Sequence, residues 1–141
     1  MITVMLSQIA DITGGELVGN DLSIESVSTD TRAIEQGALF VALVGERFDA
    51  HDFCHQAVES GAGALLVQKR VNVNVPQVVV EDSKVALGDV AAWVHKQCGT
   101  PTVAITGSCG KTTVKEMVAS ILQSKGQVLF TAGNFNNDIG V

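Results

Sequence analysis

The sequence TVAITGSCGKTTVKEM, residues 102–117, predicts a strand, a glycine-rich turn and a helix in immediate succession. Residues 102–106 are expected to form a buried strand, and 111–125 an amphipathic helix. Glycines in the turn let backbone N–H groups point inward around a phosphate, and the helix N-terminus adds partial positive charge. The stretch therefore predicts a nucleotide phosphate loop. The apolar stripe of its helix is Val114, Met117, Val118, Ile121 and Leu122.

The loop departs from the common G-x-x-x-x-G-K-[ST] pattern. Only Ser108 and Cys109 separate its glycines, and Ile105 stands where the first glycine of that pattern belongs. The alternative is an ordinary strand–turn–helix rich in small residues. Against that alternative, Lys111 can neutralise β- and γ-phosphate oxygens, and the Thr112 hydroxyl can ligate Mg²⁺. The Cys109 thiol, close to a helix N-terminus, is either reactive or simply a small tolerated residue.

Composition narrows the class of protein. The 141 residues suffice for one domain, or one and a fraction, and 46% hydrophobic with 17% charged residues supports a packed core. A net charge of −6 argues against a nucleic-acid partner. The three cysteines are widely spaced with no CxxC, so we expect reduced thiols in a cytoplasmic protein rather than disulfides or zinc. Residues 1–15 lack the basic and apolar segments of a signal peptide or membrane anchor.

Upstream of the loop, strand and helix patterns alternate, which predicts an α/β fold with a mostly parallel sheet. The apolar runs 38–44 and 64–67 are typical of strands buried on both faces. The break Gly99-Thr100-Pro101 is the expected boundary between domains at 1–99 and 100–141. The other expected elements are helices 5–14, 51–60 and 83–98, strands 16–18, 24–28, 77–80 and 127–130, a turn at 33–37 and a polar loop at 45–50.

Four segments together resemble the Mur ligase family of ATP-dependent amide ligases. They are STDTR (28–32), GALFVALVGERFDAHDF (37–53), GAGALLV (61–67) and TAGNFNNDIGV (131–141). The short loop GSCGKT is also similar to that family's loop, and the likeness covers essentially the whole chain in order. The resemblance implies an N-terminal domain that binds a UDP-muramoyl-peptide, followed by the first β–phosphate-loop–α–β unit of a truncated ATP-binding domain.

The resemblance also implies an activity. The last segment is similar to the family member that adds D-alanyl-D-alanine to UDP-N-acetylmuramoyl-tripeptide. ATP would phosphorylate the tripeptide carboxylate, and the amine of D-Ala-D-Ala would attack the acyl phosphate. Such a protein would mainly position its substrates and neutralise charge. ATP and Mg²⁺ are the implied cofactors, with no nucleic acid and no membrane insertion.

Site residues carry over by position. Lys111 would be the catalytic phosphate clamp and Thr112 the metal ligand. The nucleotide would contact Gly107, Ser108, Cys109, Gly110, Lys111, Thr112 and Thr113. The muramoyl-peptide would contact Thr29, Asp30, Thr31, Arg32, Gly45, Glu46, Arg47, Asp49, Asn134, Asn136 and Asn137.

Several of these residues have simpler explanations. Asp30 and Arg32 would equally form a local ion pair in a turn, Arg47 and Asp49 would be solvated loop charges, and the asparagines would order a loop as Asx turns. His51 would be only a residue near a helix start, and His55 and His95 would lie on solvated helix faces. Trp93 would pack in the core or between the domains, and would not stack on a base.

The remaining family machinery would lie beyond residue 141, so the resemblance implies an inactive fragment. Two arrangements would cover the apolar face of helix 111–125: packing back on the N-terminal domain, or exchange between two copies into a dimer. The whole enzyme is expected to be a monomer. Alternative functions are the preceding ligase of the pathway, a non-catalytic UDP-sugar-binding module, and a compact phosphate-loop ATPase or kinase. The last would need an acidic metal ligand on a later strand, where only Asp138 follows, in a loop.

Overall fold

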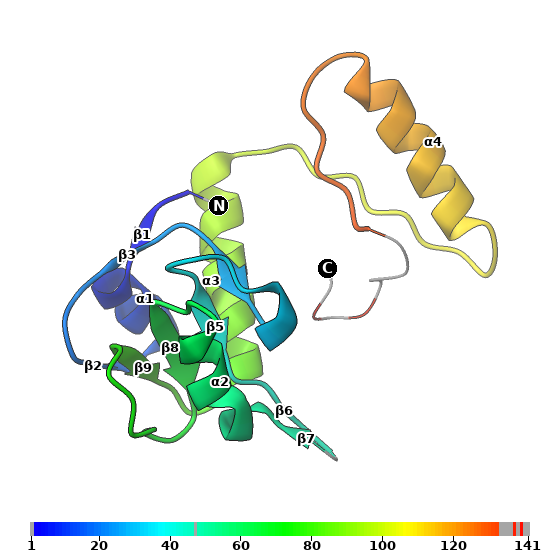
Figure 1. Cartoon of the computed structure of the whole chain (residues 1–141). Helices are drawn as coiled ribbons and strands as arrows, with labels where there is room; N and C mark the ends of the chain where they lie inside the picture. The colour runs from blue at the N-terminus through cyan, green and yellow to red at the C-terminus, as the bar shows by residue number, and fades with distance from the viewer. Residues whose placement is uncertain (1, 47, 133–136, 138, 140–141) are drawn as a thin grey trace. The chain divides into compact units, whose positions relative to one another are not determined.

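The computed structural model describes residues 2–46, 48–132, 137 and 139. It divides into two compact units, Met1–Gly99 and Thr100–Val141 (Figure 1). The described part of the first unit holds a five-stranded sheet with helices on both faces, and that of the second holds a single helix. Within the described residues, no helix combines the length and apolar character needed to cross a membrane.

The main sheet has the strand order β2-β9-β8-β5-β4. Strands β4 (Val27–Ser28), β5 (Leu39–Val41), β8 (Ala64–Val67) and β9 (Gln77–Val79) run parallel. Strand β2 (Glu16–Val18) pairs antiparallel with β9 at one edge. The predicted α/β class with a mostly parallel, mixed sheet is therefore confirmed.

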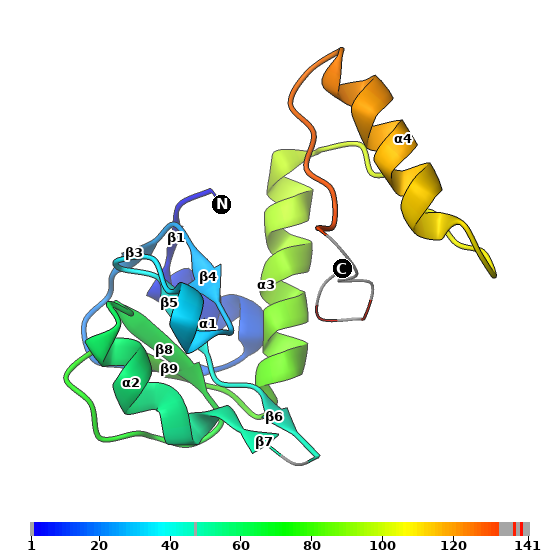
Figure 2. The ribbon, with the colours of Figure 1, turned by 45° about the vertical axis from the view of Figure 1, so that its right-hand side comes forward.

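Helices cover both faces of this sheet (Figures 1 and 2). Helices α1 (Leu6–Thr13) and α3 (Ser83–Cys98) share a buried cluster with Leu39 and Val41 of β5, whereas α2 (Cys54–Glu59) shares another with Phe40. Successive β5 side chains thus enter opposite clusters, as a strand buried on both faces requires. The partly buried Trp93 packs against the first cluster, as expected.

The ends of α3 follow their sequence signals. The Asp82 carboxylate accepts hydrogen bonds from the N–H groups of Lys84 and Val85 at 2.8 and 3.1 Å, which is an N-cap. Gly99 ends the helix with φ +58°, a left-handed conformation that favours glycine. The predicted helix 83–98 is confirmed at both ends.

Two predicted elements are subdivided. The expected strand 24–28 is two strands: β3 (Ser23–Ile24) pairs with β1 (Val4–Met5), while β4 joins the main sheet. The expected strand 38–44 ends at Val41. The segment predicted as a loop at 45–50 lies largely in an antiparallel hairpin of β6 (Val44–Gly45) and β7 (Phe48–Asp49).

Short 3-10 turns overlap the starts of two predicted elements. The turn η1 (Thr31–Ala33) ends at the first residue of the expected turn at 33–37. The turn η2 (Ala50–Phe53) occupies the start of the expected helix 51–60, so α2 begins only at Cys54. An aspartate caps each turn: Asp30 accepts from the Arg32 N–H and Asp49 from the His51 N–H, both at 2.9 Å.

In the second unit, helix α4 (Lys111–Gln123) forms where predicted, but the strands expected at 102–106 and 127–130 do not form. A strand is stabilised by hydrogen bonds to a neighbouring strand, and the described part of this unit contains no other strand with which they could pair. The expected β–loop–α–β unit is therefore wrong in its strands. Most of the apolar stripe of α4 is exposed, with Met117 61% and Ile121 65% accessible, whereas Val118 is partly buried.

Candidate functional site

A hollow of about 500 Å³ lies at the carboxyl end of β4, and we call it the β4 hollow. Ligands of open α/β sheets commonly bind beyond the carboxyl ends of parallel strands. The buried ring of Phe40 lies among the lining residues, and the other contributors come from the segment after β4, the hairpin, η2 and α2. They are Thr29, Asp30, Thr31, Arg32, Phe48, Ala50, Phe53 and Gln56. Four predicted substrate residues, 29–32, thus line one hollow.

Asp30 and Arg32 form the ion pair that was the simpler explanation of this segment. Arg32 Nη2 lies 2.6 Å from Asp30 Oδ2, and Nε lies 2.9 Å from Oδ1. These side-chain bonds, together with the Arg32 backbone N–H, lower the pKa of Asp30 to about 2. The Arg32 side chain remains 86% exposed, so its other N–H donors face solvent. The ion pair thus orients the Arg32 guanidinium and leaves some of its N–H donors accessible to a ligand.

Two phenylalanines add an aromatic surface to the hollow. The Phe48 and Phe53 rings are stacked, with centroids 5.4 Å apart and planes inclined by 24°. They are 55% and 38% exposed, unusual for side chains of this size. Phe48, Phe53 and Gln56 were not predicted from the sequence as site residues. The available signal was the pair of phenylalanines in an otherwise polar stretch, GERFDAHDF.

The hairpin holds the other predicted substrate residues of this unit. Gly45 and Glu46 are exposed, and Arg47 lies outside the described residues. Asp49 is not a solvated loop charge, because it accepts the backbone N–H of His51 and contacts the ring Nδ1 of His51 at 2.6 Å. Those two bonds, with a weaker one from Lys69, lower the pKa of Asp49 to about 2.

The phosphate loop lies in the second unit. Gly110 precedes α4 with φ +76°, a conformation that favours glycine, and no side chain among the described residues caps the helix. The first N–H groups of α4 are therefore left for a ligand. Lys111 Nζ folds back and donates to the Gly107 carbonyl at 2.5 Å. Ser108, Cys109, Thr112 and Thr113 are exposed around this turn. The loop thus combines positive-φ glycines with an uncapped helix N-terminus, two features typical of phosphate-binding loops.

The asparagine-rich segment is only partly described. Asn134 and Asn136 lie outside the described residues, and Asn137 is exposed. Their predicted contact with substrate stays a prediction. Among the histidines, His55 and His95 are exposed on helices as expected, but His51 is buried, which corrects the view of it as an ordinary residue near a helix start.

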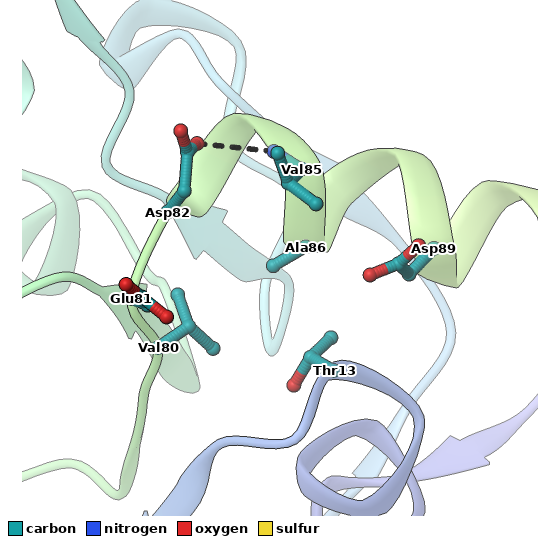
Figure 3. Close-up of a pocket in the computed structure, with 7 residues that line it drawn as sticks. All are labelled: Thr13, Val80, Glu81, Asp82, Val85, Ala86 and Asp89. Carbon is teal, nitrogen blue, oxygen red and sulfur yellow. Dashed lines mark hydrogen bonds between the residues drawn. The ribbon is translucent and has the colours of Figure 1, made fainter.

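A second hollow, of about 520 Å³, lies between the end of α1 and the start of α3 (Figure 3). Its lining includes the carboxylates of Glu81, Asp82 and Asp89, which repel phosphate groups. Asp82 also serves as the N-cap of α3. No group of three potential metal ligands occurs in the described part of the chain. The β4 hollow is therefore the better candidate for an anionic ligand.

Comparison with known proteins identifies the family. The catalytic domain of the Mur ligase family matches residues 23–97, and the Mur ligase middle domain matches residues 105–141. The chain belongs to the Mur ligase family. This confirms the resemblance seen in the sequence, and the two matched Mur ligase segments contain the β4 hollow and the phosphate loop respectively.

Individual Mur ligases align along most of the chain. UDP-N-acetylmuramoyl-tripeptide--D-alanyl-D-alanine ligase of Escherichia coli (strain K12) is 57% identical over all 141 residues, which span 31% of that relative's length. The solved structure of UDP-N-acetylmuramoylalanyl-D-glutamyl-2,6-diaminopimelate--D-alanyl-D-alanyl ligase from Acinetobacter baumannii matches 95% of this chain and 31% of its own chain, at 40% identity and TM-score 0.86. The structure of MurF ligase from Thermotoga maritima in complex with ADP matches 82% of this chain and 27% of its own chain, at 35% identity and TM-score 0.70.

The lowered pKa of Asp49 predicts how acid affects the first unit. A carboxylate whose pKa falls from 3.8 to about 2 on folding contributes stability that is complete above about pH 4 and lost as pH falls towards 2. Asp49→Asn should therefore lose less stability than the unaltered chain over this interval. Urea unfolding at pH 5 and pH 2.5, followed by fluorescence of the single tryptophan, Trp93, measures the difference. Equal losses in both proteins would contradict the assigned bonds.

Proposed function

We propose that this chain supplies the uridine-substrate domain and the phosphate loop of an ATP-dependent ligase that joins D-alanyl-D-alanine to UDP-N-acetylmuramoyl-tripeptide. The observation that carries the proposal is the 57% identity, along the entire chain, to the E. coli enzyme of that name. The activity belongs to the whole enzyme, of which this chain matches 31%, and we expect the chain alone to be inactive.

The β4 hollow is suited to the uridine diphosphate end of the substrate. A uracil ring is planar and stacks on exposed aromatic faces, which Phe48 and Phe53 provide. The diphosphate is an anion, and Arg32 presents an exposed guanidinium at the same hollow. Thr29 and Thr31 add hydroxyl groups that can donate to phosphate oxygens. Gly45, Glu46 and Asp49 belong to the neighbouring hairpin segment, and the contact of Arg47, which lies outside the described residues, stays a prediction.

The phosphate loop is suited to ATP. The uncapped N–H groups at the start of α4 would hold phosphate oxygens, Lys111 would leave the Gly107 carbonyl to neutralise them, and Thr112 would hold Mg²⁺. The bound Mg²⁺ would neutralise charge on the transferred phosphoryl group. The T. maritima relative bound to ADP supports this assignment. A non-catalytic UDP-sugar-binding module would have no use for such a loop.

The reaction then follows in two steps. The terminal carboxylate of the tripeptide attacks the γ-phosphorus of ATP, giving an acyl phosphate and ADP. The amine of D-Ala-D-Ala attacks the acyl carbon, and phosphate leaves with the carboxyl oxygen, so that an amide bond forms. The substrates carry the reacting groups, and Lys111 together with the loop N–H groups holds charge in place. Asn134, Asn136 and Asn137 would lie near the reacting groups, and the reaction would take place in the cytoplasm.

The exposed stripe of α4 supports a proposal about assembly. In the whole enzyme, which we expect to be a monomer, further chain would cover this face. In the isolated chain the exposed Met117 and Ile121 favour association of two copies. Size-exclusion chromatography with light scattering should show a dimer that Ile121→Glu converts to a monomer. A monomer at high concentration without the substitution would contradict this proposal.

Calorimetry with one variant in each unit tests the two binding assignments together. Phe48→Ala should weaken binding of UDP-N-acetylmuramoyl-tripeptide by roughly 5- to 150-fold, because stacking of one base contributes about 1–3 kcal/mol. The same substitution should leave the affinity for ADP unchanged. Lys111→Ala should weaken Mg²⁺–ADP and leave the UDP ligand unaffected. Each variant thus serves as the other's control. Loss of both ligands in either variant would contradict the assignment of separate sites.

A further inference from the structure

His51 is a buried histidine next to the β4 hollow that the reaction does not use. His51 is only 6% exposed, although its ring carries two polar nitrogen atoms. Nδ1 lies 2.6 Å from Asp49 Oδ1, and Nε2 lies 2.8 Å from the backbone nitrogen of Gln68. Both ring nitrogens therefore have partners, and the partners belong to different segments of the unit.

The two partners determine where the ring carries its proton. The Gln68 backbone N–H can only donate, so Nε2 of His51 must be the acceptor. The proton is then on Nδ1, which donates to the Asp49 carboxylate. The structure thus assigns a neutral ring with an Nδ1–H group, a definite chemical form that can be observed.

On one side the ring is tied to the hairpin. Asp49 is the last residue of β7 and pairs with Val44 of β6. Its carboxylate also accepts the His51 N–H at 2.9 Å and Lys69 Nζ at 3.3 Å. The next residue, Ala50, donates its N–H to the Leu43 carbonyl at 3.0 Å. The open end of the hairpin, opposite its turn, is therefore held where β7 meets η2.

On the other side the ring is tied to the sheet and, through it, to α3. Gln68 directly follows β8, and its side-chain amide donates to the Glu81 carbonyl at 3.2 Å. Its Oε1 lies 3.0 Å from the buried Ser83 hydroxyl at the first turn of α3. Through Gln68, His51 thus connects the hairpin to the rigid centre of the unit.

We propose that His51 is a positioning residue for the uridine substrate. By bridging Asp49 and Gln68, its ring fixes the hairpin β6–β7 and so holds Phe48 at the β4 hollow. The two bonds act together, since a hairpin of two-residue strands is marginal without further support. The identity of the ligand rests on the proposed function, whereas the bridge itself does not.

Three replacements separate the parts of this bridge. His51→Phe keeps an aromatic ring but removes both hydrogen bonds. His51→Asn keeps an N–H donor close to the place of Nδ1 and removes the acceptor for Gln68. His55→Phe is the matched control, because His55 is an exposed histidine four positions along that contacts the Asn72 carbonyl.

The test uses the full 141-residue chain and three measurements. Nitrogen-15 spectra of the imidazoles should show His51 neutral with its proton on Nδ1. Without ligand, amide hydrogen exchange at Phe48, Asp49 and Gln68 should be faster in His51→Phe than in the unaltered chain and the control. UDP binding by calorimetry should weaken about tenfold or more in His51→Phe, less in His51→Asn, and not in His55→Phe.

Each measurement can overturn the proposal. An Nε2–H form of His51, unchanged exchange in His51→Phe, or unchanged UDP affinity in that variant would each contradict it. If His51→Phe does not fold, the UDP affinity of His51→Asn and the imidazole spectrum of the unaltered chain still test the proposal. Absence of UDP binding by the unaltered chain, with the exchange pattern as expected, overturns the proposed function and leaves the bridge in place. UDP binding that His51→Phe does not weaken overturns the positioning role alone.

Discussion

The burial of the central parallel strands β5 and β8 on both faces is the constraint from which the rest of the first unit follows. Because β5 sends Leu39 and Val41 to one cluster and Phe40 to the other, helices must cover both sides of the sheet. Strand β4 is held in place by pairing with the buried strand β5, and segment 29–32 leaves the sheet at the carboxyl end of β4. A loop attached to so rigid a base can present Arg32 in one orientation, held by Asp30.

Two aspartates fix the conformation of the segments next to the hollow. Asp30 and Asp49 each cap a 3-10 turn and each bind a second group, a guanidinium in one case and an imidazole in the other. The two turns flank the same hollow. The phosphate loop in the second unit uses a different principle, in which glycine conformation and the N-terminus of α4 supply the donors directly. The two proposed anion sites are therefore built in two different ways.

Much of the first unit could be predicted from the sequence, because its signals are local. Unbroken apolar runs at 38–44 and 64–67 predicted buried strands, and the Asp82 cap with Gly99 delimited α3. The strand expected at 102–106 was wrong because a strand depends on a partner that local sequence does not contain. The aromatic side of the β4 hollow and the burial of His51 were missed for a related reason. Both depend on segments that only the folded chain brings together, such as Phe40 with Phe53 and His51 with Gln68.

We propose above all that the β4 hollow binds the uridine diphosphate end of the substrate. Titrating UDP-N-acetylmuramoyl-tripeptide into the nitrogen-15-labelled chain and recording amide chemical shifts tests it most directly. We predict that the largest changes occur at residues 29–32 and at Phe48, Phe53 and Gln56, with little change at residues 80–89. Shifts concentrated at 80–89, in the acidic hollow, would contradict the account, as would a saturable response that leaves residues 29–32 unchanged.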